Sequence, residues 1–371
     1  MPRELPYEAV IHEGPPHSQA WDSRLNEFCD ARPEQTGSYG AAMWGARRLS
    51  QLALKQGEKT AAMAQAAIFK LQALPWGVAY VKFGPVWRRT GHPESRDTLR
   101  AILRALVQEY AERRGLHLVV MPQPDIQHDK VMREELEASG LVNRRALRDP
   151  KRYLVDLEVG EEQLYRGLDQ KWRYNLKRAE RNDLTVHCGS GDAADYLQIH
   201  EEMSERKRRN SASALVLPRL NDSLPEELRP RIVFASRDAK PVAGAVILEL
   251  GDTATYLFGA TSSAGRETKA GYALHWWIAR WLRGRGIRWY DLGGEAGEPG
   301  LRQFKKGLVG RTGRVHNLLG HYERGSRPVS ALAATLLLGA RESRLMSVLR
   351  NQMLRVTGSV RAWLCVAVLA A

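Results

Sequence analysis

The chain has 371 residues, which exceeds the size of a typical single hydrophobic core and favours two domains. Its 56 Lys and Arg residues against 42 Asp and Glu residues give a net charge of +14, which suits an anionic partner such as a nucleic acid, a phosphorylated ligand or an acidic membrane surface. Its three cysteines, Cys29, Cys188 and Cys365, are far apart and indicate neither a disulfide framework nor a paired-cysteine metal site, so we expect a reducing cytoplasm.

The N-terminal residues lack the basic and then apolar run of a signal peptide. No apolar stretch of the chain reaches the ~18 residues that cross a bilayer, so we expect a soluble, cytoplasmic protein. The first half then predicts two paired strands, a helix and a further strand. These elements occupy residues 61–72, 76–84, 95–115 and 116–122.

The second half predicts the same order of elements. Runs rich in β-branched and aromatic residues, separated by turn-like residues, predict three antiparallel strands. Apolar residues at helical spacing predict a helix that ends at Gly286, and one more strand follows. These elements occupy residues 231–236, 241–250, 254–260, 270–285 and 287–292.

The two halves also share the residue pairs that end their corresponding strands and helices. Phe83-Gly84 and Phe258-Gly259 end the corresponding aromatic strands, and Arg114-Gly115 and Arg285-Gly286 end the corresponding helices. The separation between the copies is nearly constant, which indicates that one α/β unit is duplicated.

The order strand, strand, helix, strand is the central part of the fold of GCN5-related N-acetyltransferases (GNAT). Over roughly Trp21 to Tyr322 the chain resembles a narrower group, the FemABX family, whose members transfer an amino acid from aminoacyl-tRNA to a peptidoglycan precursor. The segments that carry the resemblance are GPVW (84–87), KWRYNLKRAER (171–181), YLFGATS (256–262), YDLGG (290–294) and FKKGLVG (304–310).

This resemblance implies an α/β (α+β) fold of two tandem GNAT-like acyltransferase domains, with mixed, largely antiparallel sheets flanked by helices. We expect the first domain over residues 1–150, the second over 151–328 and a helical tail over 329–371. The implied activity is aminoacyl transfer to an amine of a UDP- or lipid-linked muropeptide in cell-wall bridge formation. The acceptor is expected in a cleft between the domains, and the donor near Phe304-Lys305.

The same resemblance implies the site residues. Lys305 is the candidate for stabilising the oxyanion or the terminal phosphate, and Phe304 for shaping the acyl pocket. Asp291 is the candidate for orienting the amine, although structural hydrogen bonding to its own loop is an equal alternative. Substrate contacts are expected from Tyr256, Gly293, Gly294 and Lys306. The family's early Gln-Ser pair is replaced here by Gly40-Ala41, which leaves Arg47 as the nearest basic contact.

The segment at 161–181 predicts a helix face with two stripes. Leu164, Leu168, Trp172 and Leu176 recur every four residues and predict a core face. Arg173, Lys177 and Arg181 recur one position later, so they form either a solvated face or a cradle for phosphates, in which Tyr174 and Asn175 would stack and hydrogen-bond.

Aminolysis of an activated ester needs a neutral amine, a proton acceptor and positive charge at the developing oxyanion, but no protein nucleophile. The missing Ser-His pair therefore fits aminoacyl-tRNA as co-substrate, with no cofactor and no metal. Two alternatives remain. One is a transferase that uses acetyl-CoA, for which residues 268–273 hold a degraded form of the phosphate-binding turn. The other is an RNA-binding protein without catalysis.

The C-terminal residues and three histidines give the remaining structural predictions. Two apolar pieces within 330–371 flank a segment with several arginines, which predicts a helix packed on the first domain or an interfacial helix on an anionic membrane. His128-Asp129 would cap a helix. His316 and His321 would lie in one last strand over 314–323. We assign none of these histidines a chemical role.

Overall fold

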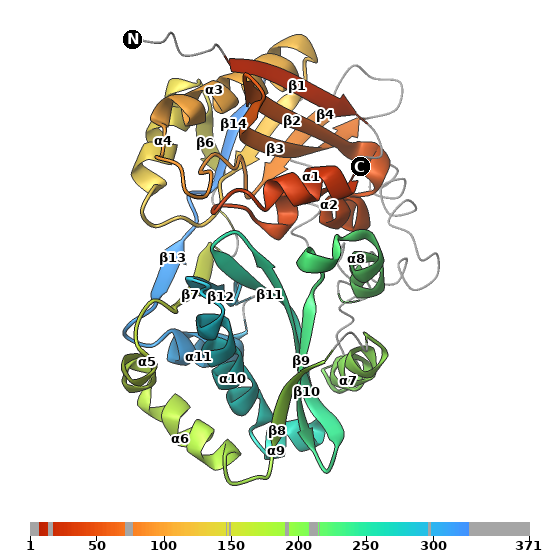
Figure 1. Ribbon diagram of the computed structural model, residues 1–371, viewed down its shortest axis with the longest axis vertical. Coiled ribbons are helices and arrows are strands. Elements are labelled where there is room, and N and C mark those ends of the chain that lie inside the picture. Colours follow the sequence, from red (N-terminus) through yellow and green to blue (C-terminus); the bar gives the residue numbers. More distant parts are fainter. Residues whose placement is uncertain are drawn as a thin grey trace. The chain divides into compact units, whose positions relative to one another are not determined.

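The computed structural model describes residues 7–13, 18–70, 77–145, 147, 150–189, 193–207, 214, 216–295 and 298–325. It divides the chain into two compact units (Figure 1). Unit 1 contains the described residues up to Pro150 together with those from Leu318 on, and unit 2 is Lys151–Asn317. The predicted helical tail over 329–371, including Cys365, lies outside the described residues.

Unit 1 is built on a seven-stranded sheet in the order β1-β2-β3-β4-β5-β14-β6. Its strands are β1 (Tyr7–Glu13), β2 (Leu49–Gln56), β3 (Lys59–Lys70), β4 (Gly77–Lys82), β5 (His117–Met121), β6 (Val142–Arg145) and β14 (His321–Arg324). Its helices are α1 (Ser18–Leu25), α2 (Gly37–Trp44), α3 (Arg96–Leu106) and α4 (Asp129–Ala138). The β4–β5 pair is parallel and the others are antiparallel.

Helix α3 shows how the sequence builds the core of unit 1. The helix begins after Ser95, whose side chain accepts the backbone N–H of Thr98 and so satisfies one free amide of the first turn. Leu99, Ile102 and Leu103 recur at helical spacing and are fully buried against the alanine-rich strand β3. The helical path continues as a π-helical turn over Val107–Arg113.

Unit 2 is built on a second seven-stranded sheet in the order β13-β7-β12-β11-β10-β9-β8. Its strands are β7 (Lys151–Asp156), β8 (Thr185–Gly189), β9 (Arg231–Arg237), β10 (Lys240–Leu250), β11 (Thr253–Thr261), β12 (Trp289–Asp291) and β13 (Arg314–Asn317). Its helices are α5 (Glu161–Gly167), α6 (Gln170–Ala179), α7 (Ala193–Arg206), α8 (Leu217–Ser223), α9 (Ser263–Glu267), α10 (Ala270–Gly284) and α11 (Pro299–Val309).

The predicted repeat is present in both units. In unit 1, β3 and β4 are antiparallel, α3 follows, and β5 returns parallel to β4. In unit 2, β10 and β11 are antiparallel, α10 follows, and β12 returns parallel to β11. Gly286 follows Arg285, the C-cap residue of α10, and has a positive φ of 76°, as a helix-ending glycine should. The predicted fold class of two mixed sheets flanked by helices is therefore confirmed.

The end of the described chain differs from the prediction. We expected one strand over 314–323 and a second domain that extends to residue 328. Instead, Leu318–Gly320 separate two strands, with Gly320 at a φ of 99°, and β14 joins the sheet of unit 1 between β5 and β6. His316 in β13 and His321 in β14 therefore belong to different sheets.

Strand β7 occupies the equivalent place in unit 2, between β12 and β13. The chain thus leaves unit 1 after β6, enters unit 2 with β7, and returns to unit 1 with β14. We call these two crossings the strand exchange.

Candidate active site

The candidate site lies in unit 2, at the point where two parallel strands part. Strands β11 and β12 pair from Thr253–Thr255 to Trp289–Asp291, and β11 then continues to Thr261 with no partner on that side among the described strands. Its pairing with β10 also shifts register at Leu257, next to Tyr256, which marks a bulge. Helices α6, α10 and α11 pack together in unit 2 (Figure 1).

Lys305 lies on the buried side of α11. The helix begins with Pro299 at its first position, where the missing N–H costs nothing, so Phe304-Lys305 belongs to a helix rather than to the glycine loop before it. The Lys305 side chain is only 5% exposed, and its Nζ donates a hydrogen bond to the carbonyl oxygen of Gly294. Nζ also lies 5.8 Å from the centroid of the Tyr256 ring.

The glycine loop lies against this lysine. A Cβ atom added to Gly293 would lie 3.7 Å from Lys305 Nζ, and Gly293 has a positive φ of 76°. The structure therefore brings four of the predicted residues together: Lys305, Tyr256, Gly293 and Gly294. Gly259 leaves room for the tyrosine, since a Cβ there would lie 1.5 Å from the Tyr256 hydroxyl oxygen.

Phe304 belongs to an aromatic cluster. Its ring centroid lies 5.9 Å from that of Trp172 on α6, 5.0 Å from that of Tyr272 and 5.2 Å from that of His275, both on α10. The predicted core face of α6 is confirmed, because Leu164, Leu168, Trp172 and Leu176 are buried in one cluster. Phe304 thus forms one apolar wall at the parting of the strands.

Asp291 ends β12 and is fully buried. Its carboxylate accepts a hydrogen bond of 2.7 Å from Arg152 on β7 and one of 2.8 Å from the backbone N–H of Gly293. These partners match the alternative in which Asp291 organises its own loop. Arg152 was not identified from the sequence, because nothing there indicates that β7 lies beside β12.

The predicted basic stripe of α6 divides into bound and exposed side chains. Arg173 donates hydrogen bonds to the backbone oxygens of Arg166 and Leu168, so it ties α6 to the end of α5. Asn175 is buried and donates to the Lys171 oxygen at 2.9 Å. Tyr174 is 62% exposed and stacks under Arg178, whose guanidinium lies 5.9 Å from the ring centroid. Lys177, Lys306 and, in unit 1, Arg47 are exposed.

Sequence analysis missed His275, which is buried on α10. Its Nδ1 lies 2.8 Å from the Tyr290 hydroxyl, and its ring meets the Tyr256 ring edge to face at 4.8 Å. Burial, assisted by the positive charge of Lys305, lowers the pKa of His275 to about 3, so the imidazole is neutral at physiological pH. The signal was available, because His275 shares a helix face with Ile278 and Leu282.

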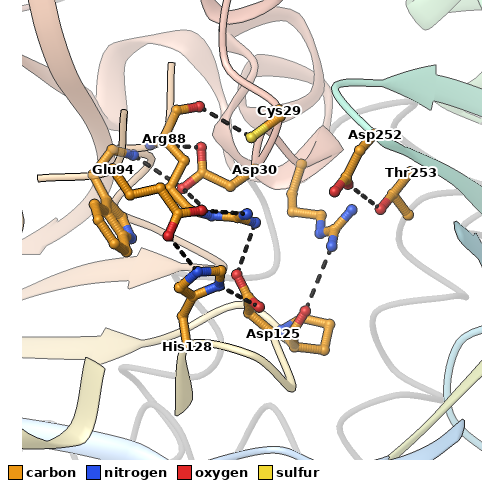
Figure 2. A network of polar contacts seen from close by, with 11 residues as sticks. Cys29, Asp30, Arg88, Glu94, Asp125, His128, Asp252 and Thr253 are labelled. Atoms are coloured by element: carbon orange, nitrogen blue, oxygen red, sulfur yellow. Dashed lines mark hydrogen bonds and ion pairs between the residues drawn. The ribbon is translucent and has the colours of Figure 1, made fainter. Parts of the chain in front are cut away.

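Unit 1 contains a separate charged network (Figure 2). Asp30 accepts the backbone N–H of Arg88 at 3.2 Å, and Arg88 forms an ion pair of 2.8 Å with Asp125. His128 bonds Asp125 at 2.8 Å and Glu94 at 2.7 Å. Burial raises the pKa of Asp30 to about 6, and the hydrogen bond to Asp125 raises the pKa of His128. His128 occupies the N-cap position of α4, as predicted, but its side chain makes no cap hydrogen bond and joins this network instead.

Two comparisons with known proteins bear on this geometry. Residues 167–306 match the acetyltransferase (GNAT) domain family. Unit 2 is a GNAT acyltransferase domain. A sequence search of curated proteins gives no match.

The whole fold is similar to a crystal structure of FemX, with 15% identity, 88% of this chain and 99% of that chain covered, and a TM-score of 0.71. It is also similar to L-PGS from Bacillus licheniformis (16% identity, 90% and 100% covered, TM-score 0.54). A third similar structure is the C-terminal domain of a putative lysylphosphatidylglycerol synthetase from Agrobacterium fabrum (14% identity, 85% and 95% covered, TM-score 0.50). At these identities the likeness shows the shared fold.

The short helix α9 lies between β11 and α10, and the predicted CoA phosphate segment, residues 268–273, follows it and includes the first turn of α10. The Glu202 carboxylate accepts the backbone N–H of Ser263 at 2.8 Å, and the Ser262 side chain accepts that of Gly265 at 3.0 Å. The Thr268 hydroxyl donates to the Ala264 oxygen at 2.9 Å. The amides of Ser263 and Gly265 lie at the N-terminus of α9; within residues 268–273 themselves, the backbone N–H of Lys269 bonds the Arg266 oxygen at 3.3 Å and that of Tyr272 bonds the Lys269 oxygen at 2.9 Å.

None of the helices formed by the described residues has the length and apolar character of a membrane span.

Proposed function

We propose that the protein is an aminoacyltransferase that moves an amino acid from aminoacyl-tRNA to an amine of a peptidoglycan precursor. The observation that supports this proposal most directly is the buried Lys305, which lies beside Tyr256 and the Gly293-Gly294 loop where β11 and β12 part. This lysine matches the one that the FemABX resemblance assigns to oxyanion or phosphate stabilisation. The FemX-like fold supports the same assignment.

The chemistry follows from the position of that positive charge. When the acceptor amine attacks the ester carbonyl, negative charge develops on the carbonyl oxygen. A cation held in a water-poor site stabilises this charge more strongly than water does, because it is already oriented. The hydrogen bond from Nζ to the Gly294 oxygen fixes the lysine before substrate arrives. The aromatic wall formed by Phe304 and Trp172 would hold the apolar part of the acyl donor.

The exposed face of α6 fits a nucleic acid donor. Lys171, Lys177, Arg178 and Arg181 are exposed, and within the described residues none of them forms an ion pair with a carboxylate. Phosphates attract such unpaired cations and release their own counterions on binding. Tyr174 offers a ring face on which an unpaired base can stack. The tRNA donor also places the reaction in the cytoplasm.

The use of acetyl-CoA is the second candidate. Its pyrophosphate would be expected at residues 268–273, where the backbone N–H groups of Lys269 and Tyr272 already bond backbone oxygens. These internal bonds leave fewer free amides for a pyrophosphate, which favours aminoacyl-tRNA over CoA as the donor. A third candidate is an RNA-binding protein without catalysis, and the experiment below also tests it.

The test is a donor and acceptor screen with the purified full chain. Radiolabelled aminoacyl-tRNAs and acetyl-CoA are offered as donors to UDP-linked muropeptides, lipid-linked muropeptides and vesicles of phosphatidylglycerol. The vesicles are included because two similar folds are named L-PGS and lysylphosphatidylglycerol synthetase. We expect transfer from aminoacyl-tRNA to a muropeptide in wild type and its loss in Lys305→Met. Transfer from acetyl-CoA alone, or tRNA binding with no transfer, would contradict the proposal.

A further inference from the structure

His275 lies among the residues of the candidate site, although no role follows for it from the FemABX resemblance. The side chain is 5% exposed, and its ring contacts Tyr256 at 4.8 Å and Phe304 at 5.2 Å, both edge to face. Lys305 lies beside the same Tyr256 ring, 5.8 Å from its centroid. His275 and Lys305 therefore flank one aromatic ring at the parting of β11 and β12.

One imidazole nitrogen of His275 is held and the other is not. Nδ1 bonds the Tyr290 hydroxyl at 2.8 Å, whereas Nε2 has no hydrogen-bond partner among the residues that the structure describes. The Tyr290 ring is also stacked on the imidazole, with centroids 6.0 Å apart. Because the two nitrogens lie on opposite sides of the ring, Nε2 faces away from the hydroxyl that holds Nδ1.

The hydroxyl of Tyr290 fixes which nitrogen carries the proton. Burial raises the pKa of Tyr290 well above its ordinary value, and burial with Lys305 lowers the pKa of His275 to about 3, so both groups are neutral. A phenol is a stronger acid than a neutral imidazole N–H, so the hydroxyl donates to Nδ1. The proton of the neutral ring then resides on Nε2. The site thus contains an N–H donor that has no partner among the described residues.

We propose that Nε2–H of His275 donates a hydrogen bond to the carbonyl oxygen of the transferred acyl group, as a second donor beside Lys305. The inference rests on the proposed acyl transfer, but it does not depend on whether the acyl group arrives on tRNA or on CoA. A neutral imidazole suits this role, because it can stabilise an oxyanion without adding a second positive charge next to Lys305.

The transfer step needs no proton from the imidazole. The lone pair of the neutral amine forms the new C–N bond, and the carbonyl π electrons move onto the oxygen, where His275 and Lys305 stabilise them. When the tetrahedral intermediate collapses, the C=O bond re-forms and the ester C–O bond breaks, with its electron pair going to the leaving ribose oxygen. The proton lost by the amine nitrogen ends on that oxygen. His275 keeps its own proton throughout.

The experiment compares three variants with wild type in a transfer assay, using the acyl donor that wild type accepts. His275→Phe keeps the aromatic contacts and removes both nitrogens, and it should lower kcat by about 100-fold or more while the KM of the acceptor changes less than about two-fold. His275→Gln keeps an N–H donor on a side chain of similar reach and should regain most of that loss. Tyr290→Phe frees the imidazole and should lower kcat by about ten-fold, because the wrong tautomer becomes populated.

A spectroscopic measurement covers the case in which a variant unfolds. In ¹⁵N-labelled wild type, the imidazole signals absent from His275→Phe are those of His275, and they should report a neutral ring protonated on Nε2. Protonation on Nδ1, or unchanged kcat in a folded His275→Phe, overturns the inference. The proposed function fails separately, when wild type itself does not use aminoacyl-tRNA.

Discussion

The neutral buried imidazole of His275 makes a quantitative prediction about stability and pH. In the unfolded chain the pKa of a histidine is 6.5, whereas in the folded protein that of His275 is about 3. Between these two values only the unfolded chain binds the proton, so acidification below pH 6.5 favours unfolding through this residue. Above pH 6.5 neither state binds it, and the residue contributes no pH dependence.

The magnitude follows from the interval between the assay pH and the unfolded pKa. At pH 5.0 that interval is about 1.5 units, and each unit is worth 1.36 kcal/mol, so unfolding is favoured by about 2 kcal/mol relative to pH 7.5. The value of about 2 kcal/mol holds for any folded-state pKa of His275 below about 4, because His275 in the folded protein then stays unprotonated at pH 5.0.

Urea unfolding of wild type and His275→Phe at pH 7.5 and pH 5.0 measures this contribution. All other titrating groups occur in both proteins and cancel in the comparison. We expect the unfolding free energy of wild type to fall by about 2 kcal/mol more than that of the variant between the two pH values. Equal falls in the two proteins would show that His275 is protonated in the folded state or is not buried, and would refute the reasoning.

Three further changes test other parts of the site. Lys305→Met should lower turnover by about 10²- to 10³-fold in the transfer assay while the circular dichroism spectrum is retained, and full activity would dismiss the lysine's role. Lys171→Gln with Lys177→Gln should weaken tRNA binding and reduce its salt slope by about 1.5, whereas Lys240→Gln, an exposed lysine at the β9–β10 turn, should change neither. Gly259→Ala should displace the tyrosine ring that packs over it, which costs about 1–3 kcal/mol of stability and lowers activity; unchanged kinetics would show that this ring has no part in transfer.

The order of strands and helices was predictable because each element carries a local signal. Short runs of β-branched and aromatic residues marked β9, β10 and β11, and the helical spacing of Leu274 and Ile278 marked α10. The strand exchange carries no such signal. Residues 314–323 look like one strand, and their sequence does not state which sheet edge is open to receive the second part.

The site was predictable in part. The sequence singled out the Phe-Lys dipeptide and the glycine loop, which lie together in the structure, but we did not predict that Lys305 is buried, since charged residues usually remain in water. Helical spacing alone would have placed Lys305 on the face of Leu308 and Val309, and His275 on that of Ile278. What the sequence could not supply is the pairing across elements, such as the hydroxyl of Tyr290 against His275.

The strand exchange has a consequence for synthesis on the ribosome. All described strands of unit 2 lie within residues 151–317, so its sheet can close as soon as that stretch has emerged. Unit 1 is synthesised first, but the strand that pairs with both β5 and β6 ends only at Arg324. Until then β5 has an open edge of unpaired backbone groups, which can recruit strands from other chains. The half of the protein made first is therefore completed last, and a fragment ending at Pro150 should aggregate rather than fold.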